Sequence, residues 1–307
     1  MTKPVIHAAI DLGSNSFRLL IAARHGGASW QPLARELITV RLGQDLRASG
    51  CLHPDAIARG LAALVRFGER LREHPPLRLR ACATHALRVA GNREAFLAPA
   101  ARLLGQPVEV IDGHEEAALA LSGVRQAVGH DAPLVVADVG GGSSELIWEG
   151  GMTSLAIGAV GLTEEFLPPM QPPGETAMAA LRAAIAAPLA AVALPPLPPH
   201  ALMVGSGGTA TALAALDLGL TTYDEARVQG HLLPLAQLAK LLARLARLDA
   251  QGRNRLPGLD QGRGEILLAG GLIYEALLAS LGRDALTVSD AGLLEGILAS
   301  TLAENPH

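Results

Sequence analysis

The chain has 307 residues and a formal net charge of −4, so it can form two domains and has no excess of positive charge that would attract nucleic acid. Hydrophobic residues make up 50% of the sequence and aromatic residues only 3%, which predicts a core of Ala, Leu and Val. No apolar run reaches the roughly 18 to 20 residues that span a bilayer, and the N-terminus does not have the form of a signal peptide. We therefore expect a cytoplasmic protein that binds neither DNA nor a membrane.

The first half of the sequence predicts three strands followed by helices that alternate with further strands. The strands are expected at 5–10, 17–22, 30–40, 77–83 and 108–111. Apolar residues at helical spacing predict helices at 55–72, at 86–104 with a break near Pro99, and at 115–127.

The pattern restarts at Pro133, where three strands again come first. In this second half, strands are expected at 134–138, 145–148, 152–157, 201–204 and 285–288. Helices are expected at 175–192, 209–216, 234–248, 264–281 and 291–302. Because both halves begin in the same way, the sequence predicts an internal duplication, with one domain at 1–125 and the other at 126–307.

Two glycine-containing loops follow the first strand of each half and share the pattern Asp-x-Gly-x-x-Ser. The first is DLGSNS at Asp11–Ser16, and the second lies in DVGGGSSE at Asp138–Glu145. Glycine-rich hairpin turns can direct several backbone N–H groups at one anion, because glycine allows close approach and positive φ angles. A tight β-turn would explain either loop alone, but their equivalent positions favour a shared binding role.

The leading aspartates of these loops predict a metal ion. An aspartate beside a phosphate would be repelled unless a divalent cation lay between them, and Mg²⁺ prefers such oxygen ligands. We therefore expect Asp11 and Asp138 on the side of a magnesium ion, with manganese as a substitute. A third glycine turn, GSGGTAT at Gly205–Thr211, follows a strand and precedes a helix, which is a geometry that can bind an anion or a nucleotide.

Five segments resemble the family of exopolyphosphatases and guanosine pentaphosphate phosphatases, within the superfamily of acetate and sugar kinases, heat-shock chaperones and actin. They are AIDLGSNSFRLLIA at 9–22, CATHALRVAGNREAF at 82–96, IDGHEEAALALSGV at 111–124, VVADVGGGSSELIW at 135–148 and GSGGTATALAAL at 205–216. The resemblance covers nearly the whole chain. It implies an α/β fold of two ribonuclease-H-like (actin-like) domains with a central cleft. It also implies hydrolysis of the terminal phosphoanhydride of polyphosphate or of guanosine pentaphosphate (pppGpp), with magnesium.

Three positions depart from residues that are usual in this family: His85, Val89 and Leu294. These departures affect the expected fine contacts with the substrate and leave the expected reaction class unchanged.

The resemblance also implies roles for single residues. Glu116 resembles the family's catalytic glutamate and is expected to activate the attacking water, while Glu145 is expected to position the metal or the water. Arg88 resembles an arginine that reaches the phosphates, for which a guanidinium fork is well suited. The other phosphate-binding candidates lie in the three loops and are Ser14, Asn15, Ser16, Gly140, Gly141, Gly142, Ser143, Ser144, Gly205, Ser206, Gly207, Gly208 and Thr209. An acidic first helical turn and a surface arginine are the alternative interpretations of Glu116 and Arg88.

A cluster of cations follows in the second half. Its members are Lys240, Arg244, Arg247, Arg253, Arg255 and Arg263. A stripe of leucines in the same segment predicts that these cations lie off the core, as a track for a polyanion or as a solvated face. Longer members of the family continue into a C-terminal helical domain, so we expect this short form to act distributively on short polyphosphates. A homodimer would extend the track.

Two other functions fit the same loops. A phosphotransferase would pass a phosphoryl group from ATP to an acceptor, and a binding module would sense guanosine tetraphosphate without turnover. The Glu-Glu-Ala segment at 115–117 argues against the first, and the presence of both Glu116 and Glu145 argues against the second. Polyphosphate and pppGpp end in similar phosphoryl groups, so the sequence does not rank these two substrates.

Overall fold

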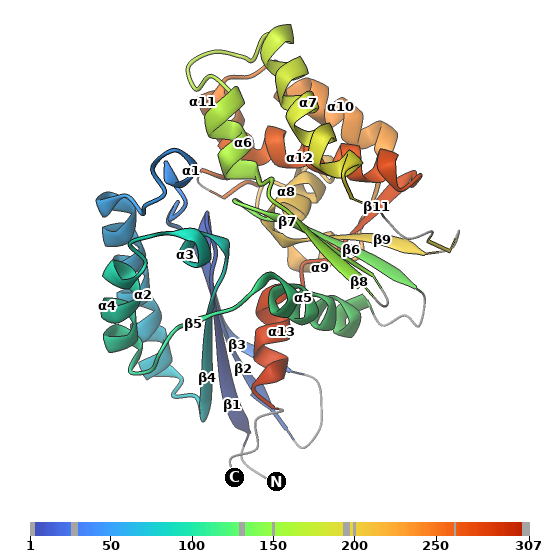
Figure 1. The fold of residues 1–307 in the computed structure, drawn as a ribbon. Helices are drawn as coiled ribbons and strands as arrows, with labels where there is room; N and C mark the ends of the chain where they lie inside the picture. Colours follow the sequence, from blue (N-terminus) through green and yellow to red (C-terminus); the bar gives the residue numbers. More distant parts are fainter. Residues whose placement is uncertain are drawn as a thin grey trace. The chain divides into compact units, whose positions relative to one another are not determined.

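The computed structural model describes residues 4–25, 30–128, 133–148, 151–192, 197–198, 201–260 and 262–302. The chain divides into two compact units (Figure 1). The first unit combines the chain up to Gly123 with the segment from Leu293 onward, and the second is Val124–Gly292. None of the helices in the described ranges is long and apolar enough to cross a membrane.

The first unit contains a five-stranded sheet in the order β3-β2-β1-β4-β5. Its strands are β1 (Val5–Leu12), β2 (Ser16–Arg24), β3 (Gln31–Thr39), β4 (Arg78–Ala83) and β5 (Glu109–Val110). The first three strands are antiparallel neighbours, whereas β1, β4 and β5 run parallel. Its helices are α1 (Leu46–Ser49), α2 (Pro54–Glu73), α3 (His85–Val89), α4 (Glu94–Leu104), α5 (Gly113–Val128, which continues into the second unit) and α13 (Leu293–Ser300).

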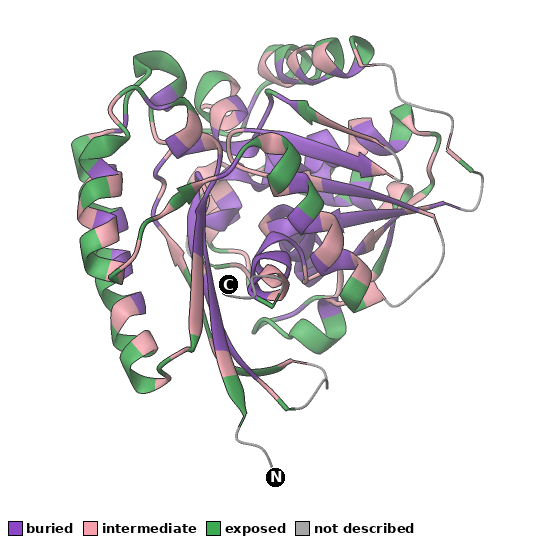
Figure 2. Cartoon of the chain, turned by 60° about the horizontal axis from the view of Figure 1, so that its bottom comes forward, coloured by how far each residue is buried: buried purple, intermediate pink, exposed green. Residues whose placement is uncertain are grey.

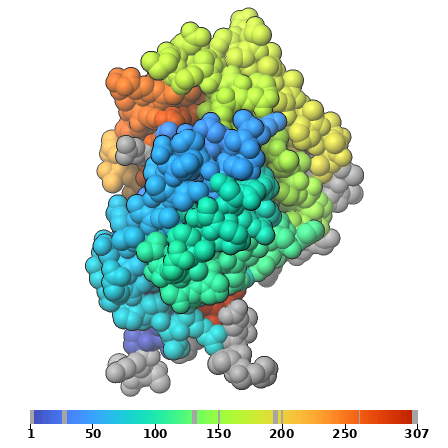
Figure 3. Space-filling model, turned by 60° about the vertical axis from the view of Figure 1, so that its left-hand side comes forward, coloured from blue at the N-terminus to red at the C-terminus, as the bar shows by residue number. Residues whose placement is uncertain are grey.

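The core of the first unit lies around its central strand. Residues 7–12 of β1 are all buried, and the exposed residues of α2 lie on its outer side (Figure 2). Helices α2 and α4 lie side by side on the surface of this unit (Figure 3). Gly60 of α2 permits this approach, because a Cβ atom at this position would lie 2.7 Å from Cε2 of Phe96.

The second unit contains a six-stranded sheet in the order β10-β11-β9-β6-β7-β8. Its strands are β6 (Leu134–Val139), β7 (Ser144–Trp148), β8 (Gly151–Leu155), β9 (Leu202–Ser206), β10 (Leu232–Pro234) and β11 (Ala285–Val288). Its helices are α6 (Ala159–Phe166), α7 (Glu175–Ala190), α8 (Gly207–Asp217), α9 (Glu225–Val228), α10 (Leu235–Leu245), α11 (Ala250–Asn254) and α12 (Arg263–Ser280). Helix α12 is buried along most of its length because α6, α7, α8, α10 and α11 all pack on it.

The two sheets confirm the predicted duplication. When β6, β7, β8, β9 and β11 are aligned with β1 to β5, the order and the strand directions agree. Both aspartates of the loops lie near the end of the first strand of their unit. The chain is therefore α/β with two actin-like sheets, as expected, and the expected central cleft stays a prediction.

Several expected elements differ from the observed ones. The helix predicted at 86–104 is broken at 90–93 and continues through Pro99. The break is held by Asn92, whose Oδ1 accepts from the Leu52 N–H at 2.7 Å and whose Nδ2 donates to the Leu52 carbonyl at 3.1 Å. Helices α1, α6, α9 and α11 and strand β10 were not predicted, because they are too short or too closely bordered by glycine and proline to give a periodic pattern.

The C-terminal helix α13 lies in the first unit, although it was expected in a second domain running to residue 307. Four of its apolar side chains, Leu293, Leu294, Ile297 and Leu298, are buried, and the helix packs on β1, β2 and β4. Just beyond it, the Thr301 hydroxyl lies 2.6 Å from Nδ1 of His7 in β1. The boundary expected at 125–126 falls inside α5.

Candidate active site

The first loop connects β1 to β2, and its carbonyl groups accept hydrogen bonds from other backbone N–H groups. Gly13 N–H donates to the Ser16 carbonyl at 3.2 Å, and a Cβ atom on Gly13 would lie only 3.0 Å from that oxygen. The Asn15 carbonyl accepts from two N–H groups of segment 40–43 at 2.9 and 2.8 Å, and the Ser14 carbonyl accepts from a third at 2.8 Å. Within the described part of the chain, the N–H groups of Ser14 and Asn15 have no acceptor. They can therefore donate to an anion.

The second loop repeats this geometry between β6 and β7. Gly140 N–H donates to the Ser143 carbonyl at 3.0 Å, and a Cβ atom on Gly140 would again lie 3.0 Å from that oxygen. The carbonyls of Gly140 and Gly141 accept from the first N–H groups of α6, at 2.9 and 2.8 Å. As in the first loop, no acceptor among the residues described here contacts the amides of Gly141 and Gly142.

Three polar side chains of the loops are engaged inside the protein. Ser144 donates its hydroxyl to the Ile157 carbonyl at 2.7 Å, and Thr209 donates to the Val139 carbonyl at 3.2 Å. The Asn15 amide donates to the Ser16 hydroxyl at 3.1 Å. The Ser144 and Thr209 hydroxyls, which were expected among the phosphate ligands, therefore hold the loops in shape.

Asp11 and Asp138, the first residues of the two loop motifs, face different side chains across their hairpins. Asp11 is 3% exposed, and its Oδ2 accepts from Arg18 Nε at 2.8 Å and from Nη2 at 2.6 Å. Its Oδ1 is buried and has no hydrogen-bond partner among the residues that the structure describes. The residue across the hairpin from Asp138 is Glu145, also 3% exposed, whose Oε1 accepts from the Ser154 hydroxyl at 2.8 Å. The first hairpin thus carries a neutral pair and the second two carboxylates.

Arg18 was missed by the sequence reasoning, although a signal for it exists. It stands seven residues after Asp11, as Glu145 stands seven residues after Asp138, so the two occupy the same register position of the duplicated hairpin. Directly opposed residues of an antiparallel pair lie on the same face, so this position lies beside the loop aspartate.

The third glycine loop lies against Asp138 of the same unit. Gly207 begins α8 with a φ of +81°, and a Cβ atom there would lie 2.6 Å from Asp138 Oδ1. The positive end of the helix dipole is favourable for this carboxylate. Gly208 lies against the Arg263 guanidinium, where a Cβ atom would lie 2.5 Å from Nη2. The Ser206 hydroxyl is buried and without a partner in the described structure.

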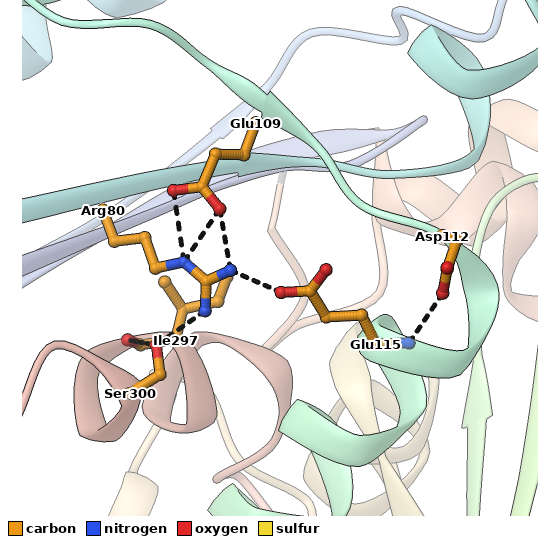
Figure 4. Close-up of polar contacts among 6 residues, drawn as sticks. All are labelled: Arg80, Glu109, Asp112, Glu115, Ile297 and Ser300. Carbon is orange, nitrogen blue, oxygen red and sulfur yellow. Dashed lines mark hydrogen bonds and ion pairs between the residues drawn. The ribbon is translucent and has the colours of Figure 1, made fainter. Parts of the chain in front are cut away.

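Glu116 and Arg88 are brought together in the first unit. Arg88 Nη1 donates to Glu116 Oε2 at 3.0 Å and to the Ile111 carbonyl at 2.8 Å. Asp112 caps the start of α5, since its Oδ1 accepts from the Glu115 N–H at 2.9 Å, and this bond lowers the pKa of Asp112. The Glu115 side chain instead contacts Arg80 (Figure 4). Of the two adjacent glutamates, Glu116 is the one held beside Arg88.

The expected cation track is smaller than the sequence indicates. Lys240, Arg244, Arg247 and Arg255 are exposed, but Arg253 is 0% exposed and Arg263 is also buried. Arg253 donates from Nη1 to the Leu248 carbonyl at 2.7 Å, and burial lowers its pKa. The expectation that all six cations lie off the core is therefore wrong for these two, because Arg253 lies in α11 and Arg263 begins α12, and both elements pack inward beyond the leucine stripe of α10.

The acidic residues were tested for their fit to a metal ion. Among the described residues, no group of three or more His, Cys, Asp or Glu side chains could hold a metal. Asp138 and Glu145 form an opposed pair of carboxylates on one face of the β6–β7 hairpin. Mg²⁺ is commonly bound by one or two carboxylates together with substrate phosphates and water, so this pair fits Mg²⁺.

Two hairpin loops with free amides and a nearby pair of acidic residues, built on duplicated actin-like sheets, define a phosphate-handling enzyme. The chain belongs to the Ppx/GppA phosphatase family, whose model matches residues 20–305. It is 38% identical to exopolyphosphatase 2 of Mycobacterium tuberculosis, with 95% of this chain and 97% of the relative covered. It is 35% identical to guanosine-5'-triphosphate,3'-diphosphate pyrophosphatase of Vibrio campbellii, covering 95% of this chain and 58% of that protein.

The fold agrees with solved structures of the same family. The crystal structure of the Aquifex aeolicus Ppx/GppA family member superposes with a TM-score of 0.82 at 31% identity, over 99% of this chain and 100% of that one. The fold and the reaction class expected from the sequence are therefore confirmed, and the chain is a phosphatase.

Proposed function

We propose that this phosphatase hydrolyses the terminal phosphoanhydride of inorganic polyphosphate and releases orthophosphate. The observation that carries the proposal is the repeated loop geometry, in which free amides of Ser14 and Asn15, and of Gly141 and Gly142, are available to phosphoryl oxygens. The relative named exopolyphosphatase 2 supports polyphosphate, because the match extends over 97% of its length. The alternative substrate is pppGpp, which the Vibrio campbellii relative supports over 58% of its length.

Glu116 is the proposed base that accepts a proton from the attacking water. Its carboxylate is mostly buried and is held by Arg88 at 3.0 Å, so it starts from a fixed position. Arg88 also places an opposite charge beside the carboxylate that is proposed to accept the proton. Arg88 is also proposed to contact a phosphoryl oxygen, because a guanidinium can serve two oxygen acceptors at once.

Asp138 and Glu145 are the residues that we propose to hold Mg²⁺, with Mn²⁺ as a substitute. When bound, such an ion would neutralise charge on the phosphoryl oxygens. Asp11 is proposed on the metal side through Oδ1 alone, because Oδ2 is taken by Arg18. The loop amides bind the phosphoryl group and orient it toward the water.

Two functions considered at the outset are not supported. Membership of a phosphatase family disfavours both an ATP-dependent phosphotransferase and a module that binds an alarmone without turnover. A homodimer remains part of the proposal, and light scattering tests it by distinguishing 31.7 kDa from twice that mass.

The test measures orthophosphate release from polyphosphate and from pppGpp in parallel, with heat-inactivated protein as the blank. We expect a higher kcat/KM on polyphosphate. A higher kcat/KM on pppGpp would establish the alternative substrate. If neither substrate releases phosphate above the blank, the proposed reaction is wrong.

A further inference from the structure

The first turn of helix α5 contains two consecutive glutamates, and each is bound by a different arginine. Glu116 contacts Arg88, and Glu115 contacts Arg80. Successive residues of a helix point about 100° apart, so the two carboxylates face different partners. Because both glutamates belong to the same helical turn, a contact that fixes the Glu115 side chain also limits the movement of Glu116.

Arg80 joins three elements of the first unit (Figure 4). From β4 its Nε and Nη2 donate to Glu109 Oε2 of β5 at 3.1 and 2.7 Å, and its Nη1 donates to the Ser300 hydroxyl of α13 at 2.8 Å. Nη2 also donates to Glu115 of α5. The Arg80 side chain is only 11% exposed, whereas those of Glu109 and Glu115 are 46% and 44% exposed.

We propose that Arg80 is a positioning residue for the reaction: by holding Glu115, it fixes the first turn of α5 so that Glu116 keeps its place beside Arg88. This inference rests on the proposed role of Glu116. It assigns to the Arg80–Glu115 pair an effect on turnover, although neither residue contacts the substrate.

The surroundings of the pair explain why Arg80 can act in this way. Its guanidinium fork is fixed on two other sides by Glu109 and Ser300, so it presents a rigid donor to Glu115. Without that donor, the first turn of α5 would lose a side-chain contact that fixes its rotation, and Glu116 would be held less firmly beside Arg88. The Asp112 cap holds the Glu115 N–H but not its side chain.

The same surroundings predict that the pair matters little for folding. Acidic residues in the first turn are favoured by the helix dipole, so α5 does not need Arg80 to form. Ion pairs with half-exposed carboxylates also contribute little to stability. A loss of activity without a loss of stability is therefore the expected signature.

The experiment compares Arg80→Gln, Glu115→Ala and the double variant with Glu109→Ala, which removes the other carboxylate from Arg80 without touching α5. For each protein, kcat, KM and the thermal midpoint are measured with polyphosphate. We expect kcat to fall about tenfold for Arg80→Gln and Glu115→Ala, because small misplacements of a reacting group are costly, while KM stays within about twofold. The double variant should be no slower than Arg80→Gln, since the pair acts as one unit.

The control Glu109→Ala should lose much less kcat than Glu115→Ala, because Ser300 still holds Arg80 and the Arg80–Glu115 contact is kept. The inference is overturned if Arg80→Gln and Glu115→Ala keep full kcat, or if Glu109→Ala loses as much as Glu115→Ala. Glu116→Gln separates these outcomes from a failure of the proposed function. If that variant is inactive while Arg80→Gln is unchanged, only the positioning role is lost, and if it stays active, the role of Glu116 itself is wrong.

Discussion

Arg18 donates two hydrogen bonds to a single oxygen of Asp11, at the register position where the second unit places Glu145 opposite Asp138. Duplication has thus produced two loops with the same backbone geometry but different local charge. The first hairpin is neutral around its aspartate, and the second has two carboxylates and no directly opposed cation. The residues suited to a divalent cation are accordingly in the second unit, and the first unit offers amides and the Arg88–Glu116 pair.

Removing Arg18 should destabilise the protein, because it leaves Asp11 as a buried charge without its partner. For Arg18→Gln we expect the free energy of unfolding in urea to fall by about 2–3 kcal/mol, somewhat less than for a fully buried pair because Arg18 retains some exposure. The double variant Asp11→Asn/Arg18→Gln should recover part of this loss, since no charge is then stranded. Arg24→Gln, on the same strand, is the control. Equal losses for Arg18→Gln and the control would contradict the prediction.

Substituting the proposed base should slow turnover without weakening binding. Glu116→Gln keeps the size of the side chain but cannot accept the proton, so kcat should fall by about 10² or more while KM is held or falls. Steady-state kinetics with polyphosphate check this. A larger loss for Glu115→Gln than for Glu116→Gln would show that the wrong neighbour was chosen.

Chelation should abolish activity if a divalent cation is required. We expect no orthophosphate release in excess chelator and full recovery with Mg²⁺ or Mn²⁺. Asp138→Asn and Glu145→Gln should each raise the Mg²⁺ concentration needed for half-maximal rate by about tenfold or more. Asp11→Asn should raise it less, because Arg18 already neutralises Asp11. Activity that persists in chelator would refute the metal assignment of all three carboxylates.

Stability should fall as the pH drops from 7.5 to 5.5, in part because of His7. Burial lowers the pKa of His7, and the cations Arg78 and Arg24 lower it further. The unfolded chain therefore binds a proton more readily than the folded one, so stability is lost as pH falls through the ordinary His pKa of about 6.5. His7→Gln should show a smaller drop in thermal midpoint over this range. Because the pKa of His85 is lowered as well, some dependence should remain. An unchanged drop in His7→Gln would exclude this contribution.

Long polyphosphate should be degraded distributively. The exposed cations are Lys240, Arg244, Arg247 and Arg255, and contacts from such side chains are strongly screened by salt. A digest of polymer several hundred units long should give a ladder of shortening chains on a gel. Neutralising all four cations should slow digestion of the polymer more than that of tripolyphosphate. Full-length polymer that persists beside free phosphate, with no intermediate lengths, would show processive action.

The architecture could be predicted because it follows from local patterns. The apolar run before each loop and the glycines at Gly13 and Gly140 determine a strand and a tight turn, so duplication was visible in the sequence. The pairing of Asp11 with Arg18 was not predicted, because it depends on hairpin register rather than on a motif. The burial of Arg253 was not predicted for a related reason: leucine periodicity describes α10 but carries no information about the short helix α11 that follows it.

The second unit is one unbroken stretch of chain, whereas the first is assembled from two pieces that are separated by more than half of the sequence. During synthesis, every residue of the second unit therefore leaves the ribosome before α13, whose four buried apolar side chains complete the core over β1. Until then, β1 lacks its cover on that side. The half of the protein that is made first is consequently the half that is finished last.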